Sequence, residues 1–166
     1  MEIEADIATL ARRLVAEAMR AGWRVATAES CTGGLVAGAI TDIEGSSAVL
    51  DRGFITYSNK AKTDLVGVPD ELLAQYGAVS EPVARAMAEG ALRLSQAHVS
   101  VAITGIAGPG GGSAEKPVGL VHFAVAGPKG VSHREERFGR TLSRQEIRRL
   151  AVETALRLLT DAVVAD

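Results

Sequence analysis

A serine in a short polar turn is the first residue of this chain that could carry covalent chemistry. Ser30 lies in the segment 29–34 (ESCTGG), between a β-rich stretch and a run of small residues that is typical of a helix. A serine on a strand-to-helix turn places its hydroxyl beside unpaired backbone N–H groups, which can stabilise the oxyanion formed when a carbonyl carbon is attacked. The spacing equally allows Ser30 or Thr32 to act only as a helix cap. The turn lacks the Gly-x-Ser-x-Gly pattern of ordinary hydrolases.

A serine nucleophile needs a base, which histidine or lysine could supply. The three histidines, His98, His122 and His133, fall in stretches expected to be strands, so we assign them structural roles. A lysine acts as a base when burial or a neighbouring cation lowers its pKa, although most lysines are solvated surface charges. Lys60 and Lys62 follow an expected strand end, and their spacing alone does not decide between them.

Cys31, the single cysteine, is the alternative nucleophile beside Ser30. A thiolate at a helix N-terminus would have a lowered pKa. Neighbouring residues of a tight turn point in different directions, so a cleft-facing Ser30 leaves Cys31 as a small buried hydrophobe. The sequence contains no His-Glu-x-x-His motif, no paired cysteines and no carboxylate cluster with ligand spacing, and we expect no metal site.

Two further features favour ligand binding. The glycine-rich segment 104–112 lacks the P-loop and Gly-x-Gly-x-x-Gly patterns, so it is either a ligand loop or a plain flexible turn. Arg144 and Arg148 lie in the first turns of an expected helix, where they would either bind phosphate or form a solvated face. Ligands of open α/β sheets bind outside the carboxyl ends of strands. We expect four polar segments to converge in one cleft: 29–34, 45–47, 57–62 and 104–112.

The hydrophobic pattern predicts the elements that must position these residues. The expected helices cover 6–20, ending near Gly22, then 35–43, and a stretch from 59 that is broken at 68–70, where another short helix starts. Two more are expected over 82–96 and from the Ser143–Glu146 capping box onward. The expected strands cover 23–27, 48–58 (one strand or two short ones), 98–106, and an antiparallel hairpin of 118–126 and 131–138. The last helix is expected to bury Ile147, Leu150, Ala151, Thr154, Leu158 and Leu159, and the 82–96 helix Val83, Ala86, Met87, Gly90 and Leu94. This order of elements predicts a single-domain three-layer α/β/α sandwich with a mixed sheet over residues 1–166.

Composition narrows the class of protein. The chain has 166 residues, 47% of them hydrophobic and 23% charged, as in one ordinary globular domain. A net charge of −2 does not indicate a nucleic-acid partner. The N-terminus does not resemble a signal or transit peptide, and the longest apolar runs are too short to span a bilayer. We expect a cytoplasmic protein with no membrane or nucleic-acid partner, and a homodimer on base rates.

Four of these segments, in order, resemble the CinA C-terminal domain family, also known as the nicotinamide mononucleotide deamidases or PncC. The motifs are Glu-Ser-Cys-Thr-Gly-Gly from residue 29, Gly-Ser-Ser from residue 45, Tyr-Ser-Asn-x-x-Lys from residue 57 and Gly-Ile-Ala-Gly-Pro from residue 105. The likeness extends from about residue 6 to residue 160. Each motif alone is weak, but their combination is highly specific.

The resemblance implies hydrolysis of nicotinamide mononucleotide to nicotinate mononucleotide and ammonia, a recycling step in pyridine nucleotide metabolism. The family has a serine–lysine arrangement without a metal or cofactor. Its serine corresponds to Ser30 and its lysine to Lys62 rather than Lys60, and its tyrosine corresponds to Tyr57, as a helper in proton transfer or positioning. In the expected mechanism neutral Lys62 takes the proton of Ser30, which attacks the carboxamide carbon.

Substrate binding is assigned partly from this resemblance and partly from the turn itself. Amides around 32–34 are expected to hold the oxyanion, and the glycine loop and the arginines to anchor ribose and phosphate. The expected substrate-binding residues are Thr32, Gly33, Gly34, Ser46, Ser47, Asn59, Thr104, Gly105, Arg144 and Arg148. Relatives often carry Phe-x-Gly-Asp-Arg before the last helix, whereas this chain has Phe138, Gly139 and Arg140, which makes Arg140 a further candidate for phosphate.

Two other functions remain open on the sequence. The chain could be a non-catalytic nucleotide-binding or regulatory module linked to competence or DNA-damage responses, against which the intact set of Ser30, Tyr57 and Lys62 argues. It could also act on a different amide with the same residues. Ammonia release from nicotinamide mononucleotide distinguishes turnover from mere binding.

Overall fold

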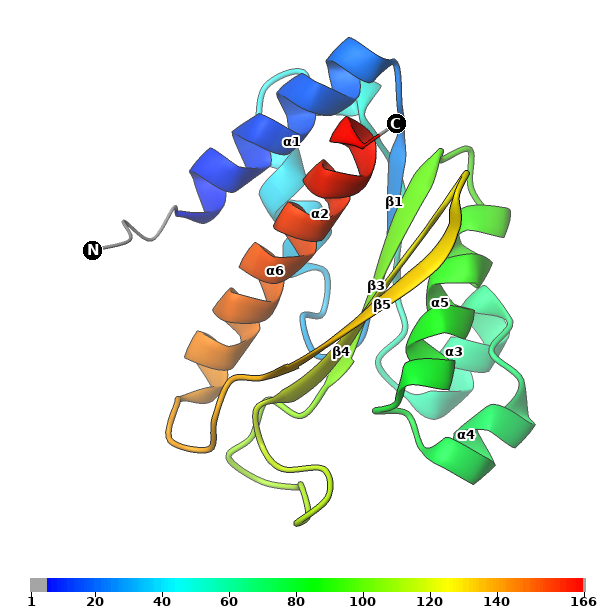
Figure 1. The fold of residues 1–166 in the computed structure, drawn as a ribbon, viewed down its shortest axis with the longest axis vertical. Coiled ribbons are helices and arrows are strands. Elements are labelled where there is room, and N and C mark those ends of the chain that lie inside the picture. Colours follow the sequence, from blue (N-terminus) through cyan, green and yellow to red (C-terminus); the bar gives the residue numbers. More distant parts are fainter. Residues whose placement is uncertain (1–5, 166) are drawn as a thin grey trace.

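Five strands form one mixed sheet that separates two layers of helices (Figure 1). The computed structural model describes residues 6–165, so the expectations for residues 1–5 and 166 lie outside the described part. The helices are α1 (Ile7–Ala21), α2 (Leu35–Thr41), the short 3-10 helix η1 (Ser46–Ala48), α3 (Asn59–Val66), α4 (Asp70–Tyr76), α5 (Glu81–Arg93) and α6 (Arg144–Val164). The strands are β1 (Val25–Glu29), β2 (Leu50–Ile55), β3 (Val99–Gly105), β4 (Leu120–Gly127) and β5 (Gly130–Arg137). The expected three-layer α/β/α sandwich is confirmed.

The strand order is β2-β1-β3-β4-β5. β2 and β3 lie parallel to β1 on either side of it, whereas β4 runs antiparallel to β3 and pairs with β5 in the expected hairpin. The carboxyl ends of β1, β2 and β3 therefore meet at one edge of the sheet. The polar turns that follow these strands are brought together at this edge.

Each face of the sheet has its own hydrophobic core. Helices α1, α2 and α6 cover one face, over a core that includes Leu14, Ile40 and Phe123. Helices α3, α4 and α5 lie on the other face, where the core is richer in alanine and includes Met87. The layer with α3 supplies the candidate base, and the layer with α6 supplies the candidate arginines.

Helix starts follow the capping residues that the sequence offers. Side-chain oxygens of Asp6, Ser58, Ser80 and Ser143 accept hydrogen bonds from N–H groups in the first turns of α1, α3, α5 and α6. Each bond satisfies one of the donors that a helix N-terminus leaves without an intrahelical partner. Gly22, with φ 69°, ends α1 in the left-handed conformation. The helix end expected near Gly22 and the start expected at Ser143 are confirmed.

Some boundaries differ from the expectation. β1 begins two residues late, at Val25, because the N–H of Trp23 still bonds the carbonyl of Ala18 at the end of α1. β2 covers only 50–55 of the stretch 48–58, since η1 occupies its start. α5 ends at Arg93, so Leu94 is 44% exposed instead of buried.

The expected buried stripe of α6 is partly wrong. Ile147, Ala151 and Leu159 are buried, whereas Leu150, Thr154 and Leu158 are only half-buried. The side chains buried in their place include Val152, Ala155 and Leu156. α6 packs against the sheet and also against α1, so its buried face is wider than a single stripe. In residues 6–165, no helix combines the length and apolar character needed to cross a membrane.

Candidate active site

Ser30 directly follows β1 at the carboxyl edge of the sheet. Its N–H donates to the carbonyl oxygen of Ile103 in β3 at 2.9 Å, which holds its backbone against the centre of the sheet. Its carbonyl accepts from the N–H of Gly33 at 3.0 Å, closing the turn that leads into α2. Only 8% of Ser30 is exposed. The hydroxyl therefore occupies a fixed and largely dry position.

Lys62 meets this hydroxyl from the other helical layer. It lies in α3, which Ser58 caps, and it is 1% exposed. Its Nζ lies 3.1 Å from Oγ of Ser30, 2.8 Å from the carbonyl oxygen of Thr56 and 3.2 Å from that of Tyr57. Lys60 instead lies at the surface, where it pairs with Asp64 at 3.1 Å. Of the two lysines, only Lys62 contacts Ser30.

The surroundings of Lys62 favour the neutral amine. Burial lowers the pKa of Lys62 below its ordinary value of 10.5 and outweighs the opposing effect of Cys31. A neutral amine has two N–H donors and one lone pair. Donation to the carbonyls of Thr56 and Tyr57 uses both donors and leaves the lone pair for the proton of Ser30. This geometry suits a general base.

Tyr57 contacts the lysine through its backbone rather than its hydroxyl. Its side chain is 62% exposed, and its hydroxyl oxygen lies 3.1 Å from Nη2 of Arg144 in α6. Nη1 of Arg144 donates to the carbonyl of Gly108 at 2.9 Å. Within residues 6–165, the Tyr57 hydroxyl makes no hydrogen bond to Ser30 or Lys62. The position of the Tyr57 side chain suits a role in lining the pocket better than a role in proton transfer.

A pocket of about 220 Å³ opens over the Ser30–Lys62 pair. It is lined by Ser30, Cys31, Tyr57, Asn59, Lys62, Ala78, Val79, Thr104, Gly105, Ala107 and Arg144. The structure thus brings Asn59, Thr104, Gly105 and Arg144 of the expected binding residues to the reactive pair. Ala78 and Val79 were missed, because small apolar residues in a loop carry no chemical signal in the sequence. Thr104 fastens that loop, since its hydroxyl donates to the carbonyl of Ala78 at 2.9 Å.

Gly105 has a steric reason to be glycine. A Cβ at this position would lie 2.7 Å from Cγ2 of Val121 and 2.9 Å from the carbonyl oxygen of Leu120 in the neighbouring strand. Both distances are shorter than real Cβ contacts allow. The absence of a side chain lets β3 and β4 stay paired up to the floor of the pocket.

The side chains of other expected binding residues do not line this pocket. The hydroxyl of buried Thr32 points to Glu29, and Gly34 lines a separate groove with Arg148. A Cβ on Gly33 would lie 3.7 Å from Nη2 of Arg148. Nε of Arg148 donates to the carbonyl of Cys31 at 3.0 Å, so this arginine braces the turn.

Ser46, Ser47 and Arg140 are also remote from the reactive pair. The expectation that segment 45–47 joins the cleft is wrong, because η1 precedes β2 beside the start of β1 and thus lies at the opposite edge of the sheet. Arg140 lines another hollow along the glycine-rich loop. Neither segment touches the Ser30–Lys62 pair.

Glu29 is the functional candidate that the sequence analysis missed. It is 1% exposed, and its carboxylate accepts hydrogen bonds from the N–H groups of Gly34, Val36 and Ala37. The N–H of Gly34 is therefore not free for an oxyanion, and that of Gly33 bonds the carbonyl of Ser30, contrary to the expectation for these two residues. Within residues 6–165, the N–H groups of Cys31 and Thr32 are the two of the turn that donate to no oxygen of another residue. The signal available in the sequence was an acidic residue directly before the serine, at the end of the apolar stretch that was expected to be a strand.

The remaining reactive side chains have other surroundings. Burial raises the pKa of the Cys31 thiol to about 11, so it lacks the activation of a nucleophile. Nδ1 of His98 accepts from the N–H of Arg24, and His122 and His133 bond each other at 2.8 Å on β4 and β5. The structural roles expected for the histidines agree with these contacts. In the described part of the chain, no three His, Cys, Asp or Glu side chains are grouped to hold a metal ion.

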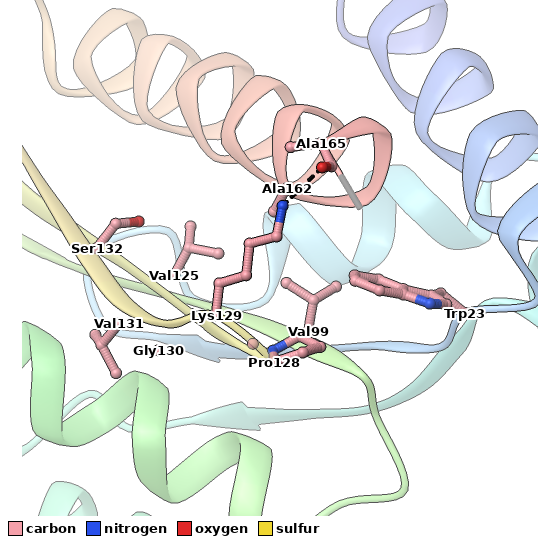
Figure 2. Close-up of a pocket in the computed structure, with 11 residues that line it drawn as sticks. Trp23, Val99, Val125, Pro128, Lys129, Gly130, Val131, Ser132, Ala162 and Ala165 are labelled. Carbon is pink, nitrogen blue, oxygen red and sulfur yellow. Dashed lines mark hydrogen bonds between the residues drawn. The ribbon is translucent and has the colours of Figure 1, made fainter.

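A second cavity of about 220 Å³ lies between the β4–β5 hairpin and the C-terminal end of α6 (Figure 2). Its walls are mostly apolar and include Trp23, Val99 and Pro128. Its lysine, Lys129, donates to the carbonyl of Ala165 at 2.7 Å. The pair of a buried serine and a buried lysine makes the pocket over Ser30 the stronger candidate for chemistry.

Fold and site together define a three-layer α/β protein in which a serine hydroxyl contacts a buried lysine at the carboxyl ends of parallel strands. Residues 7–163 match the family model described as CinA C-terminal domain. The chain belongs to this family.

Individual relatives bear out the family assignment. A CinA-like protein of Syntrophobacter fumaroxidans is 53% identical over 155 residues, which cover 93% of this chain and 36% of that protein. A protein of Enterobacter agglomerans named nicotinamide-nucleotide amidohydrolase PncC is 63% identical over 109 residues, 66% of each chain. The crystal structure of the competence/damage inducible protein CihA from Agrobacterium tumefaciens superposes with a TM-score of 0.93 at 55% identity, covering 99% of both chains. This chain spans about a third of the Syntrophobacter protein's length.

Proposed function

We propose that this protein hydrolyses the carboxamide of nicotinamide mononucleotide to nicotinate mononucleotide and ammonia, as a step in pyridine nucleotide recycling. The observation that carries the proposal is the 3.1 Å contact between Oγ of Ser30 and Nζ of buried Lys62 inside a pocket. The name of the Enterobacter agglomerans relative supports the choice of substrate. We place the protein in the cytoplasm.

Acyl transfer in this site proceeds in two steps. Neutral Lys62 takes the proton of Ser30 as Oγ attacks the carboxamide carbon, and the N–H groups of Cys31 and Thr32 are the candidates to receive the oxyanion. The Lys62 ammonium then protonates the leaving nitrogen, which departs as ammonia and leaves an ester on Ser30. Lys62, neutral again, deprotonates a water that attacks this ester, and nicotinate mononucleotide leaves as Ser30 regains its proton from Lys62.

The nucleotide part of the substrate is assigned to the mouth of the pocket. Arg144 stands there with its guanidinium between Tyr57 and the loop at Gly108. A guanidinium binds phosphate through paired N–H donors. Binding energy from the remote phosphate would orient the amide over Ser30.

The test is ammonia release by purified protein from nicotinamide mononucleotide, nicotinamide riboside and nicotinamide. Ser30→Ala and Lys62→Ala are each expected to lower kcat by about 10³-fold or more, because the nucleophile and its base act as a unit. The matched control is Lys60→Ala, which removes an exposed lysine of the same helix and should leave kcat unchanged. Near-wild-type ammonia release by Ser30→Ala would contradict the covalent scheme.

A non-catalytic nucleotide-binding or regulatory module is the competing function, and relatives named for competence and damage make it relevant. A module that only binds nucleotide gains nothing from burying a lysine against a serine hydroxyl, since that burial costs desolvation energy. Binding of nicotinamide mononucleotide without any ammonia release would favour this alternative. Ammonia release from another amide, without release from nicotinamide mononucleotide, would favour a different substrate.

A further inference from the structure

Glu29 occupies the end of β1 and bonds to both structures that carry the reactive pair. Its Oε1 accepts from the hydroxyl of Thr32 at 2.7 Å and from the N–H groups of Val36 at 2.9 Å and Gly34 at 3.3 Å. Its Oε2 accepts from the N–H of Ala37 at 3.1 Å and lies 3.2 Å from Oγ1 of Thr27. An ionised carboxylate is an acceptor with about four lone-pair sites, and these contacts occupy that capacity.

The backbone of Glu29 holds the lysine side of the site. Its carbonyl oxygen accepts from the N–H of Thr56 at 2.8 Å. The carbonyl of Thr56 in turn accepts from Nζ of Lys62 at 2.8 Å. The side chain of Glu29 therefore bonds the turn that carries Ser30. Its backbone bonds Thr56, whose carbonyl accepts from Lys62.

The side chains of Glu29 and Lys62 have separate hydrogen-bond partners. Lys62 bonds a hydroxyl and two carbonyl oxygens, and none of its hydrogen bonds goes to Glu29. A carboxylate paired with the ammonium would favour the charged lysine and weaken it as a base. The carboxylate of Glu29 bonds the start of α2 and Thr32 instead, and it is not among the groups that shift the pKa of Lys62.

We propose that Glu29 is a positioning residue, whose carboxylate fastens the turn 30–34 to the N-terminus of α2 and thereby sets Ser30 against Lys62. The proposal rests on the proposed function for its kinetic consequences, but its geometric consequence does not depend on the substrate. Glu29 touches no substrate in this scheme and transfers no proton.

The decisive variant is Glu29→Gln, which keeps the shape and replaces one acceptor oxygen by an NH₂ group. In either orientation this donor faces a backbone N–H, that of Ala37 or those of Gly34 and Val36, so the start of α2 must shift. A displacement of about 1 Å at a reacting group costs about 10²-fold in rate. We expect kcat to fall about 10- to 100-fold with the KM for nicotinamide mononucleotide within about threefold of wild type.

The matched control is Ser100→Ala, which removes another fully buried hydrogen bond, the 2.6 Å bond from Ser100 to the carbonyl of Ala88. This variant is expected to lose stability and keep kcat, because β3 carries Ser100 far from the turn. A folded Glu29→Gln protein with kcat within about twofold of wild type would overturn the proposal, as would a rise in KM without a fall in kcat. If Glu29→Gln does not fold, Thr32→Val, which removes only the 2.7 Å bond to Oε1, is judged by the same kcat and KM criteria.

A crystal structure of the folded variant separates this inference from the proposed function. The distance between Oγ of Ser30 and Nζ of Lys62 is expected to lengthen beyond hydrogen-bonding range from its present 3.1 Å. An unchanged distance would overturn the positioning role, even if the wild-type protein proves inactive on nicotinamide mononucleotide. Wild-type inactivity with a lengthened distance in the variant would refute the substrate and leave the positioning role supported.

Discussion

Lys62 combines almost complete burial with contacts to uncharged oxygens alone. The carbonyls of Thr56 and Tyr57 accept hydrogen bonds from its Nζ, the hydroxyl of Ser30 lies 3.1 Å away, and none of these groups carries a negative charge. Lys60, two residues away, has the opposite environment, since it is exposed and paired with Asp64. Desolvation disfavours the ammonium form of a buried amine, and this effect distinguishes the two lysines chemically.

The pH dependence of turnover tests this environment. Because burial lowers the pKa of Lys62 and only the neutral amine accepts the proton of Ser30, kcat is expected to rise with pH to a plateau, with a midpoint below 10.5. Steady-state ammonia release across a pH series gives the profile. A midpoint at or above 10.5 would contradict a desolvated base.

The same pKa shift has a consequence for stability. Lys62 has a lower pKa in the folded than in the unfolded protein, so between these two values the unfolded state binds more protons and stability rises with pH. Wild type should therefore gain stability over Lys62→Met as pH approaches 10.5, by at most about 1.4 kcal/mol per pH unit. Urea unfolding at several pH values measures the difference, and a gain toward lower pH would have the wrong sign.

Cys31 provides a separate test at the same scale. Burial raises the pKa of its thiol to about 11, so almost no thiolate is present near neutral pH. Iodoacetamide is expected to alkylate the native protein at least about 10-fold more slowly than the urea-unfolded protein, since the thiolate is the reacting form. Activity of Cys31→Ala near that of wild type would agree with Ser30 as the nucleophile. Loss of turnover would instead favour Cys31 as the nucleophile.

At the scale of elements, the site depends on how strands end at one edge of the sheet. β1 ends at Glu29, directly before Ser30, β2 leads through Thr56 to α3, and β3 ends at Gly105 beside the pocket. Parallel pairing of the three strands makes these ends neighbours. The caps Ser58 and Ser80 then hold the ends of the loops that lead into α3 and α5.

Gly105→Ala tests the close approach of β3 and β4. The added Cβ meets Val121 and Leu120, so the variant is expected to lose about 1–3 kcal/mol of unfolding free energy through overpacking and to lose activity as the floor shifts. Gly110→Ala is the matched control, because a Cβ there meets no atom within 4 Å, and its stability should stay within about 0.5 kcal/mol of wild type. Equal stability of the two variants in urea unfolding would contradict the steric argument.

At the scale of the whole molecule, the pocket is assembled from both helical layers. Lys62 comes from α3 on one face of the sheet and Arg144 from α6 on the other, and Tyr57 bridges them through its carbonyl and its hydroxyl. The site therefore exists only when both layers are packed on the sheet. The homodimer remains a prediction, which light scattering of the purified protein measures.

Arg144→Ala tests the assignment of phosphate to the mouth of the pocket. Hydrogen bonds to charged groups contribute about 1.5–3 kcal/mol, so loss of the guanidinium should raise the Kd for nicotinamide mononucleotide about 10- to 150-fold. Calorimetry in the inactive Ser30→Ala background isolates binding from turnover. Nicotinamide riboside, which lacks the phosphate, should bind both proteins alike. An equal loss for both ligands would mean that Arg144 does not contact phosphate.

Much of the fold and part of the site followed from the sequence by itself. Hydrophobic periodicity, serine caps and glycine ends act over a few residues, so the order of elements, the hairpin and the place of Ser30 on a strand-to-helix turn were all predictable. The resemblance to the CinA C-terminal domain family selected Lys62 where spacing left Lys60 equally possible. These signals are local or are carried by motifs, and no knowledge of packing is needed to recognise them.

Only the tertiary structure decided which polar residues share a pocket. Because β2 runs parallel to β1, the helix η1 before β2 places Ser46 and Ser47 at the amino ends of the strands, although their motif lies between those of Ser30 and Lys62 in the chain. Packing of α6 against both sheet and α1 likewise buries Leu156 where the pattern indicated Leu158. The role of Glu29 arises from donors up to eight residues away that converge on one carboxylate. Such convergence depends on the direction of each side chain in three dimensions, which sequence spacing does not specify.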